Sequence, residues 1–90
     1  MRKRVEVNYI GRVHGVGFRF TAERAAIKFK VFGYVKNVPN GKVKMVAEGE
    51  EEVLKPFLDA IYLDMGHYVE KFNIHWFPAT NEFKRFEIRY

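Results

Sequence analysis

The sequence has 90 residues, no cysteine, 48% hydrophobic residues and a formal net charge of +5. A chain of this length forms one domain, and we expect a single domain over residues 1–90. The absence of cysteine excludes a disulfide scaffold and a thiolate metal site.

The net charge indicates which partners to expect, and the first residues of the chain indicate where the protein is located. A positive balance favours anionic partners, either phosphorylated metabolites or nucleic acid, without choosing between them. The basic residues 1–4 are followed by alternating residues rather than an apolar segment, so we expect no signal peptide and a cytoplasmic protein. No apolar run approaches the roughly 20 residues of a transmembrane helix, so we expect no membrane partner.

The first half of the chain predicts a strand, a loop, a helix and a hairpin. Residues 3–10 alternate and predict a half-buried strand, and three glycines within residues 11–18 predict a loop. An apolar stripe predicts a helix over residues 20–29, with Thr21 on its polar side. Strands are predicted at residues 32–38 and 42–47, joined by a tight turn at Asn40-Gly41. The inward residues of these elements are Val5, Val7, Tyr9, Ala22, Ala25, Ala26, Phe29, Val43, Met45 and Ala47.

The second half predicts one helix and two strands. Three glutamates at residues 50–52 suit a helix N-terminus, and an apolar face runs from Val53 to Met65. Gly66 is the predicted C-terminal cap, whereas Pro56 leaves the first helical residue open. Strands are predicted at residues 69–77, with a bulge, and at 83–90, with Phe86 and Ile88 inward. The order β-α-β-β-α-β plus a terminal strand predicts an α+β, ferredoxin-like split βαβ sandwich, with two helices on one face of a mainly antiparallel sheet.

The glycine-rich loop at residues 11–19 is a candidate phosphate site. Glycines let successive backbone N–H groups turn inward around an anion, and the following helix adds its unpaired N–H groups. Arg19, at the start of that helix, offers a planar fork of donors that matches a phosphoryl group. A surface connection that binds nothing is the alternative. The spacing fits neither a P-loop nor a dinucleotide fingerprint.

Asn37 is the second candidate, at the end of the strand before the hairpin. It has the same strand parity as Val35, so it faces the helices if Val35 does. A carboxamide is not a base, but it can hold a water molecule by accepting one hydrogen bond and donating another. A residue that only supports the turn is the alternative reading.

Together these two segments resemble the signatures of the acylphosphatase family. Gly11 to Arg19 fits the first signature except that His14 stands where the family has glutamine, and Gly33 to Val43 fits the second at every defined position. The resemblance extends to the terminal strand and is weakest over residues 66–80, where Gly66-His67 replaces the usual glycine-proline.

The resemblance implies an enzyme that hydrolyses the carboxyl-phosphate bond of small acyl phosphates without metal or cofactor. Carried over residue by residue, Arg19 and Asn37 are catalytic: Arg19 holds the phosphoryl group and Asn37 positions the attacking water. The resemblance also implies a phosphate-binding loop of backbone N–H groups, formed by His14, Gly15, Val16, Gly17 and Phe18. A phosphate or sulfate ion can occupy the same site, and we expect a monomer.

Two other functions remain open from the sequence. The same fold type carries RNA-recognition modules, and Phe32 and Tyr34 could stack on bases. However, Val31 occupies that motif's glycine position, and the segment falls on the second strand rather than the third, so nucleic acid is not the expected partner. The other alternative is a catalytically silent relative within a larger carbamoyl-transfer protein. We interpret the His14 side chain as loop support and expect His67 and His75 at the surface.

Overall fold

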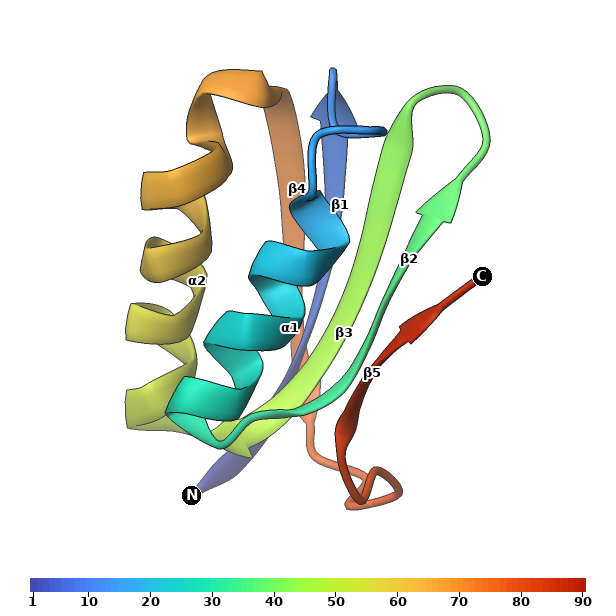
Figure 1. Cartoon of the computed structure of the whole chain (residues 1–90). Coiled ribbons are helices and arrows are strands. Elements are labelled where there is room, and N and C mark those ends of the chain that lie inside the picture. Colours follow the sequence, from blue (N-terminus) through green and yellow to red (C-terminus); the bar gives the residue numbers. More distant parts are fainter.

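The computed structural model describes all residues 1–90 and shows two helices on one face of a five-stranded sheet (Figure 1). The sheet order is β4-β1-β3-β2-β5, and only the pairing of β2 with β5 is parallel. The predicted ferredoxin-like α+β fold is therefore confirmed. The elements are β1 (Arg2–Gly11), α1 (Phe18–Phe29), β2 (Phe32–Val38), β3 (Lys42–Glu50), α2 (Glu51–Met65), the 3-10 helix η1 (Gly66–Tyr68), β4 (Val69–Pro78) and β5 (Phe86–Arg89).

The core lies between the helices and the inner face of the sheet. Alternation along β1 and β3 turns every second side chain toward the helices, as the sequence predicts. Large side chains of α2 complete the layer opposite them. The least exposed core residues include Val5, Val7, Ala22, Ala26, Val35, Val43, Met45, Ala47, Leu54, Phe57 and Ile61, all at 0–1% exposure.

Helix α1 begins two residues earlier than predicted, at Phe18 rather than residue 20. Gly17, in the left-handed conformation, ends the loop and starts the helix at once. The expected polar position of Thr21 is wrong, because its side chain is 6% exposed. Phe18 and Thr21 broaden the buried stripe on the side that faces the sheet.

Helix α2 runs through Pro56 and continues into η1. Since proline has no N–H, the carbonyl of Glu52 lacks its helical donor, and the exposed position of Pro56 leaves that carbonyl to solvent. Gly66 is the C-terminal cap of α2, as predicted, and it has right-handed helical angles. A Cβ at Gly66 would come within 2.9 Å of the Tyr62 ring, which explains the glycine. Neither helix is both long and apolar enough to cross a membrane.

Four of the five strands differ from the prediction at their ends, and β1 is longer by one residue at each end. β3 extends to Glu50 because β1 pairs with it along its whole length, down to Arg2 opposite Glu50. β5 begins only at Phe86, because its ladder with β2 starts with Phe86 opposite Gly33. The predicted bulge is present at the start of β4, which ends at Pro78: Ile10 lies opposite Lys71 but the next residue lies opposite Val69, which leaves Glu70 unpaired.

Candidate active site

The glycine-rich loop connects β1 to α1 at one end of the sheet, beside the β2–β3 hairpin (Figure 1). Gly15 and Gly17 have φ angles of +74° and +79°, in the left-handed region where side chains with a Cβ are strained. No atom would lie within 4 Å of a Cβ at either residue. Glycine is therefore required here by the backbone conformation, and not because a side chain would clash. The loop therefore turns sharply while its inner side stays open.

The backbone amides of this loop are unused by the fold. No N–H group from His14 to Phe20 donates a hydrogen bond to another group of the protein, and the first intrahelical bond runs from the Thr21 N–H to the Gly17 carbonyl. Helix α1 also has no side-chain cap and no acidic residue in its first turn. The loop and the helix N-terminus together present free donors and the positive end of the helix dipole.

Arg19 lies in the first turn of α1 and is half-buried. It forms no ion pair with any carboxylate of the protein. Its guanidinium carbon lies 4.9 Å from the centre of the Tyr90 ring, a cation–π contact that restricts the side chain without neutralising it. The positive charge thus remains available to an anion.

Asn37 lies near the end of β2, past the last residue that pairs with β5. Its Oδ1 atom is buried and has no hydrogen-bond partner, and it is the only buried side-chain polar atom in this condition. An unpaired buried acceptor costs about 1–3 kcal/mol. The fold therefore keeps an acceptor whose partner must come from outside the chain.

One cavity of about 180 Å³ brings these groups together. The structure places Arg19, Asn37 and three of the predicted loop residues around it, while His14 and Val16 do not line it. Its lining consists of Val13, Gly15, Gly17, Phe18, Arg19, Phe20 and Asn37. No group of three or more His, Asp or Glu side chains in the protein converges to hold a metal ion.

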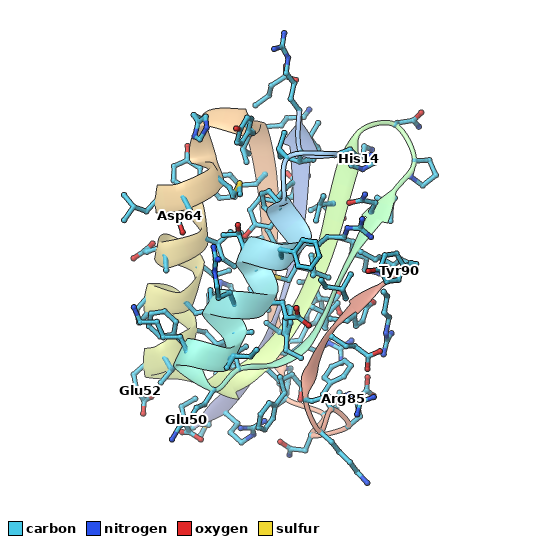
Figure 2. All side chains as sticks on the ribbon, in the orientation of Figure 1. His14, Glu50, Glu52, Asp64, Arg85 and Tyr90 are labelled. Carbon is cyan, nitrogen blue, oxygen red and sulfur yellow. The ribbon has the colours of Figure 1, made fainter.

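The His14 side chain ties the loop to the hairpin. Its Nε2 atom donates to the carbonyl oxygen of Lys42 at 2.6 Å, and Figure 2 shows His14 beside the end of the hairpin strands. This bond joins the loop to the β-hairpin whose other strand carries Asn37. The side chain thus supports the loop from outside the cavity.

The sequence did not reveal the wall behind the cavity. The Phe18 ring packs against Tyr9 with a centroid distance of 4.7 Å, and both residues are buried. Burial also raises the pKa of the Tyr9 hydroxyl well above its usual value, which keeps it neutral. The alternation of β1 predicts an inward Tyr9, but its contact with Phe18 depends on how the loop folds back.

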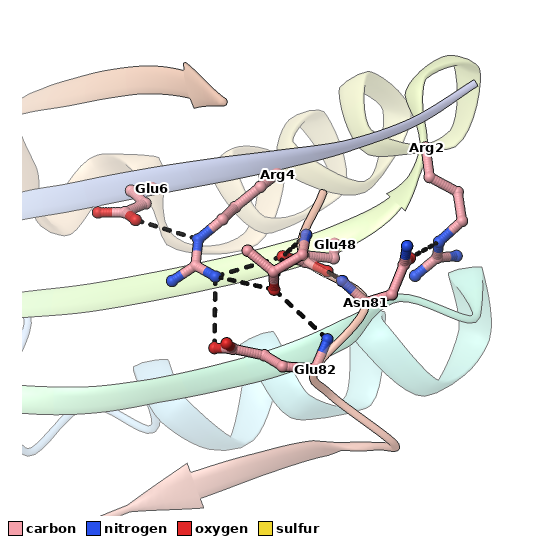
Figure 3. A network of polar contacts seen from close by, with 7 residues as sticks. Arg2, Arg4, Glu6, Glu48, Asn81 and Glu82 are labelled. Atoms are coloured by element: carbon pink, nitrogen blue, oxygen red, sulfur yellow. Dashed lines mark hydrogen bonds and ion pairs between the residues drawn. The ribbon is translucent and has the colours of Figure 1, made fainter. Parts of the chain in front are cut away.

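Glu48 is a second polar residue whose environment the sequence did not reveal, on the opposite face of the sheet. Its side chain is fully buried and accepts hydrogen bonds from the Thr80 N–H and Oγ1, the Asn81 N–H and the Arg4 guanidinium at 2.8–3.3 Å (Figure 3). Burial by itself raises the pKa of Glu48, but these hydrogen bonds outweigh it and the net shift is downward. The network is structural, because it lies on the other side of the sheet from the cavity.

Comparisons with known proteins agree with the geometry. The sequence profile of the acylphosphatase family matches residues 5–88. The chain is similar to acylphosphatases of Syntrophus aciditrophicus, with 38% identity over all of this chain and 95% of that protein, and of Geobacillus thermodenitrificans, with 39% identity over 98% and 95%. The crystal structure of acylphosphatase from Bacillus subtilis superimposes with a TM-score of 0.88 at 31% identity, covering 98% of this chain and 99% of that one. This chain belongs to the acylphosphatase family of hydrolytic enzymes.

Proposed function

We propose that the protein hydrolyses acyl phosphates to a carboxylate and inorganic phosphate, with Arg19 and Asn37 as the catalytic side chains and without a metal ion. Arg19 and the free amides of residues 14–18 bind the phosphoryl oxygens. The Asn37 Oδ1 accepts a hydrogen bond from the attacking water and orients its lone pair toward phosphorus.

The chemistry of the substrate explains why such a site suffices. The leaving group is a carboxylate, whose conjugate acid has a pKa of about 4–5 by comparison with side-chain carboxyl groups. It departs without a general acid, unlike the alkoxide of a phosphate monoester. The phosphoryl transition state is loose and gathers charge on its equatorial oxygens, so positioning and fixed donors supply the catalysis.

The unpartnered Oδ1 of Asn37 is the observation that carries this proposal. Asn37 lines the same cavity as Arg19 and the glycines of the loop. A water molecule held there and a phosphoryl group held by Arg19 would be neighbours. The cavity has room for the phosphoryl group and a water, so the acyl group extends toward solvent.

The RNA-recognition alternative requires that the Phe32 and Tyr34 rings be free to stack on bases, and their contacts do not favour it. The Arg89 guanidinium lies over the Tyr34 ring at 4.0 Å, and Phe83 packs against the same ring at 6.0 Å. Arg2 lies over Phe32 at 5.9 Å. Both rings already have partners within the protein.

The first prediction tests the assignment with benzoyl phosphate as substrate, in the presence of a chelator. We expect turnover in the chelator, and a loss of about 10²–10³ in kcat for Arg19→Ala and for Asn37→Ala, because each removes a preorganised contact to the reacting groups. Inorganic phosphate should inhibit competitively. A phosphate monoester should not react.

Two variants control for general effects of the substitutions. Arg24→Ala removes an exposed arginine of the same helix, and Asn73→Ala removes an exposed asparagine of β4. Both should keep wild-type activity. Turnover that survives Arg19→Ala, or that disappears with the chelator, would contradict the proposed mechanism.

A further inference from the structure

One hydrophobic residue beside Arg19 is not used by the fold. Three hydrophobic side chains line the cavity that holds Arg19 and Asn37, and they are Val13, Phe18 and Phe20. Val13 and Phe18 are 1% and 2% exposed and belong to the hydrophobic core, whereas Phe20 is 68% exposed. Phe20 is therefore the only one of the three whose surface is mostly open to a bound molecule.

The Phe20 ring has no partner within the protein. It forms no contact with another aromatic ring, and no Lys or Arg lies over it. It is also absent from the partly buried hydrophobic residues that pack against the core. Single exposed apolar residues are common at protein surfaces. Phe20 differs from most of them because it lines the cavity that contains the proposed catalytic side chains.

Helix α1 brings Phe20 to the open side of this cavity. Phe20 directly follows Arg19 in the first turn of the helix. Successive helix residues point about 100° apart, so the two side chains approach the cavity from different directions. Asn37 reaches the same cavity from β2, in the sheet layer. A carboxamide from the sheet thus lies across the cavity entrance from a phenyl ring of the helix layer.

The charge of the lining limits what the rest of a substrate can contact. Arg19 is the only charged residue that lines the cavity, and the proposed chemistry uses its charge for the phosphoryl group. The lining has no second cation for a carboxylate or another phosphate on the acyl group. What it offers to that part of the substrate is the apolar surface of Phe20.

We propose that Phe20 is a specificity residue, whose ring contacts the acyl group and favours acyl phosphates with an aromatic or other large apolar acyl group. This inference rests on the proposed function and names the substrate class of that same site. In-line displacement places the leaving oxygen opposite the attacking water. Since Asn37 holds the water from the sheet layer, the acyl group leaves on the side of α1, where Phe20 is exposed.

Steady-state kinetics with two substrates test the contact. Benzoyl phosphate carries a ring that can cover Phe20, whereas acetyl phosphate carries only a methyl group. Phe20→Ala should lower the ratio of kcat/KM for benzoyl phosphate to kcat/KM for acetyl phosphate about three- to tenfold, mainly through KM, because contacts between aromatic rings contribute on this scale. The comparison with wild type cancels the difference in reactivity between the two substrates. Phe20→Leu keeps an apolar side chain and should retain part of the ratio.

Ile27→Ala is the matched control. Ile27 is a 70% exposed apolar residue of the same helix and does not line the cavity. Its substitution should leave both kcat/KM values unchanged. A second readout separates the acyl contact from a disturbed loop: inorganic phosphate has no acyl group, so its inhibition constant should change little in Phe20→Ala.

A non-hydrolysable analogue tests the same contact without turnover. Phenacylphosphonate has a methylene group in place of the bridging oxygen of benzoyl phosphate. We expect nuclear Overhauser effects between its phenyl protons and the Phe20 ring, and weaker binding to Phe20→Ala by the same factor as the change in KM. A substrate ratio that is unchanged in Phe20→Ala, or a bound analogue whose ring does not contact Phe20, would overturn this inference and leave the proposed function intact. Hydrolysis of neither substrate by the wild-type protein would overturn both.

Discussion

At the scale of single residues, the site depends on what the fold leaves unsatisfied. The Asn37 Oδ1 has no partner, Arg19 has no carboxylate, and the loop amides have no acceptor. Burying unpaired polar groups lowers stability. Free donors and a free acceptor in one cavity are what the binding of an anion and a water requires.

His14 provides a test at this scale. His14→Ala removes the bond to the Lys42 carbonyl, so the loop is no longer tied to the hairpin that carries Asn37. We expect kcat/KM for an acyl phosphate to fall about tenfold, the equivalent of one hydrogen bond of about 1–1.5 kcal/mol, mainly through KM. His14→Gln keeps an N–H donor and should restore most of the loss. His67→Ala, an exposed histidine outside the site, should change neither constant.

At the scale of elements, the irregular segment between β4 and β5 buries Glu48 and positions the start of β5. Residues 80–82 cover the outer face of the sheet and bury Glu48, whose carboxylate binds two of their backbone N–H groups. This contact holds the start of β5 in place, so that the short strand can pair with β2. The segment links one edge of the sheet to the other.

Glu48→Gln tests this link. The substitution leaves backbone donors of the segment without a charged acceptor, and we expect a loss of about 1–3 kcal/mol in the free energy of unfolding at neutral pH. Since folding lowers the pKa of Glu48, its contribution is complete above the usual carboxylate range and disappears as the pH falls through the folded pKa. The difference between wild type and variant in urea unfolding should therefore shrink below about pH 4.

Glu50→Gln is the control for this prediction. Glu50 is an exposed residue at the end of the same strand, where it pairs with the N-terminal amino group at 3.1 Å. An exposed pair of this kind contributes about 0–1 kcal/mol. Equal losses for the two variants, or a loss for Glu48→Gln that is independent of pH, would contradict the role assigned to Glu48.

At the scale of the whole molecule, the distribution of charge bears on substrate capture. On the outer face, Lys36 lies directly opposite Lys44 on one side and Arg89 on the other, so three cations stand in one row across three strands. The two lysines form no ion pair. Like charges directly opposite each other destabilise a sheet, and here they lie next to Asn37. The row lies on the opposite face of the sheet from the cavity, and we interpret it as a source of long-range positive potential around the site.

Ionic strength tests this interpretation. We expect kcat/KM for an anionic acyl phosphate to fall several-fold as salt is raised past about 0.1 M, where the screening length is about 10 Å. Lys36→Gln should lower kcat/KM at low salt and flatten the salt dependence, with kcat unchanged. Lys30→Gln, beyond the far end of α1 from Arg19, is the control. A salt dependence that is identical in wild type and Lys36→Gln would show that the row of cations does not contribute to substrate capture.

The sequence by itself determined what depends on local pattern. Alternation predicted the inner faces of β1 and β3, Asn40-Gly41 predicted the hairpin turn, and glycine spacing predicted the loop before α1. The family signatures also singled out Arg19 and Asn37. These features depend on backbone angles and side-chain periodicity, which neighbouring residues define.

Tertiary structure alone decided what depends on distant parts of the chain. Glu48 lies on the face that alternation assigns to solvent, yet residues 80–82 bury it. Arg19 and Asn37 share a cavity only because β2 places its end beside the N-terminus of α1. Burial, pairing and convergence are properties of segments brought together in space, and no local pattern contains them.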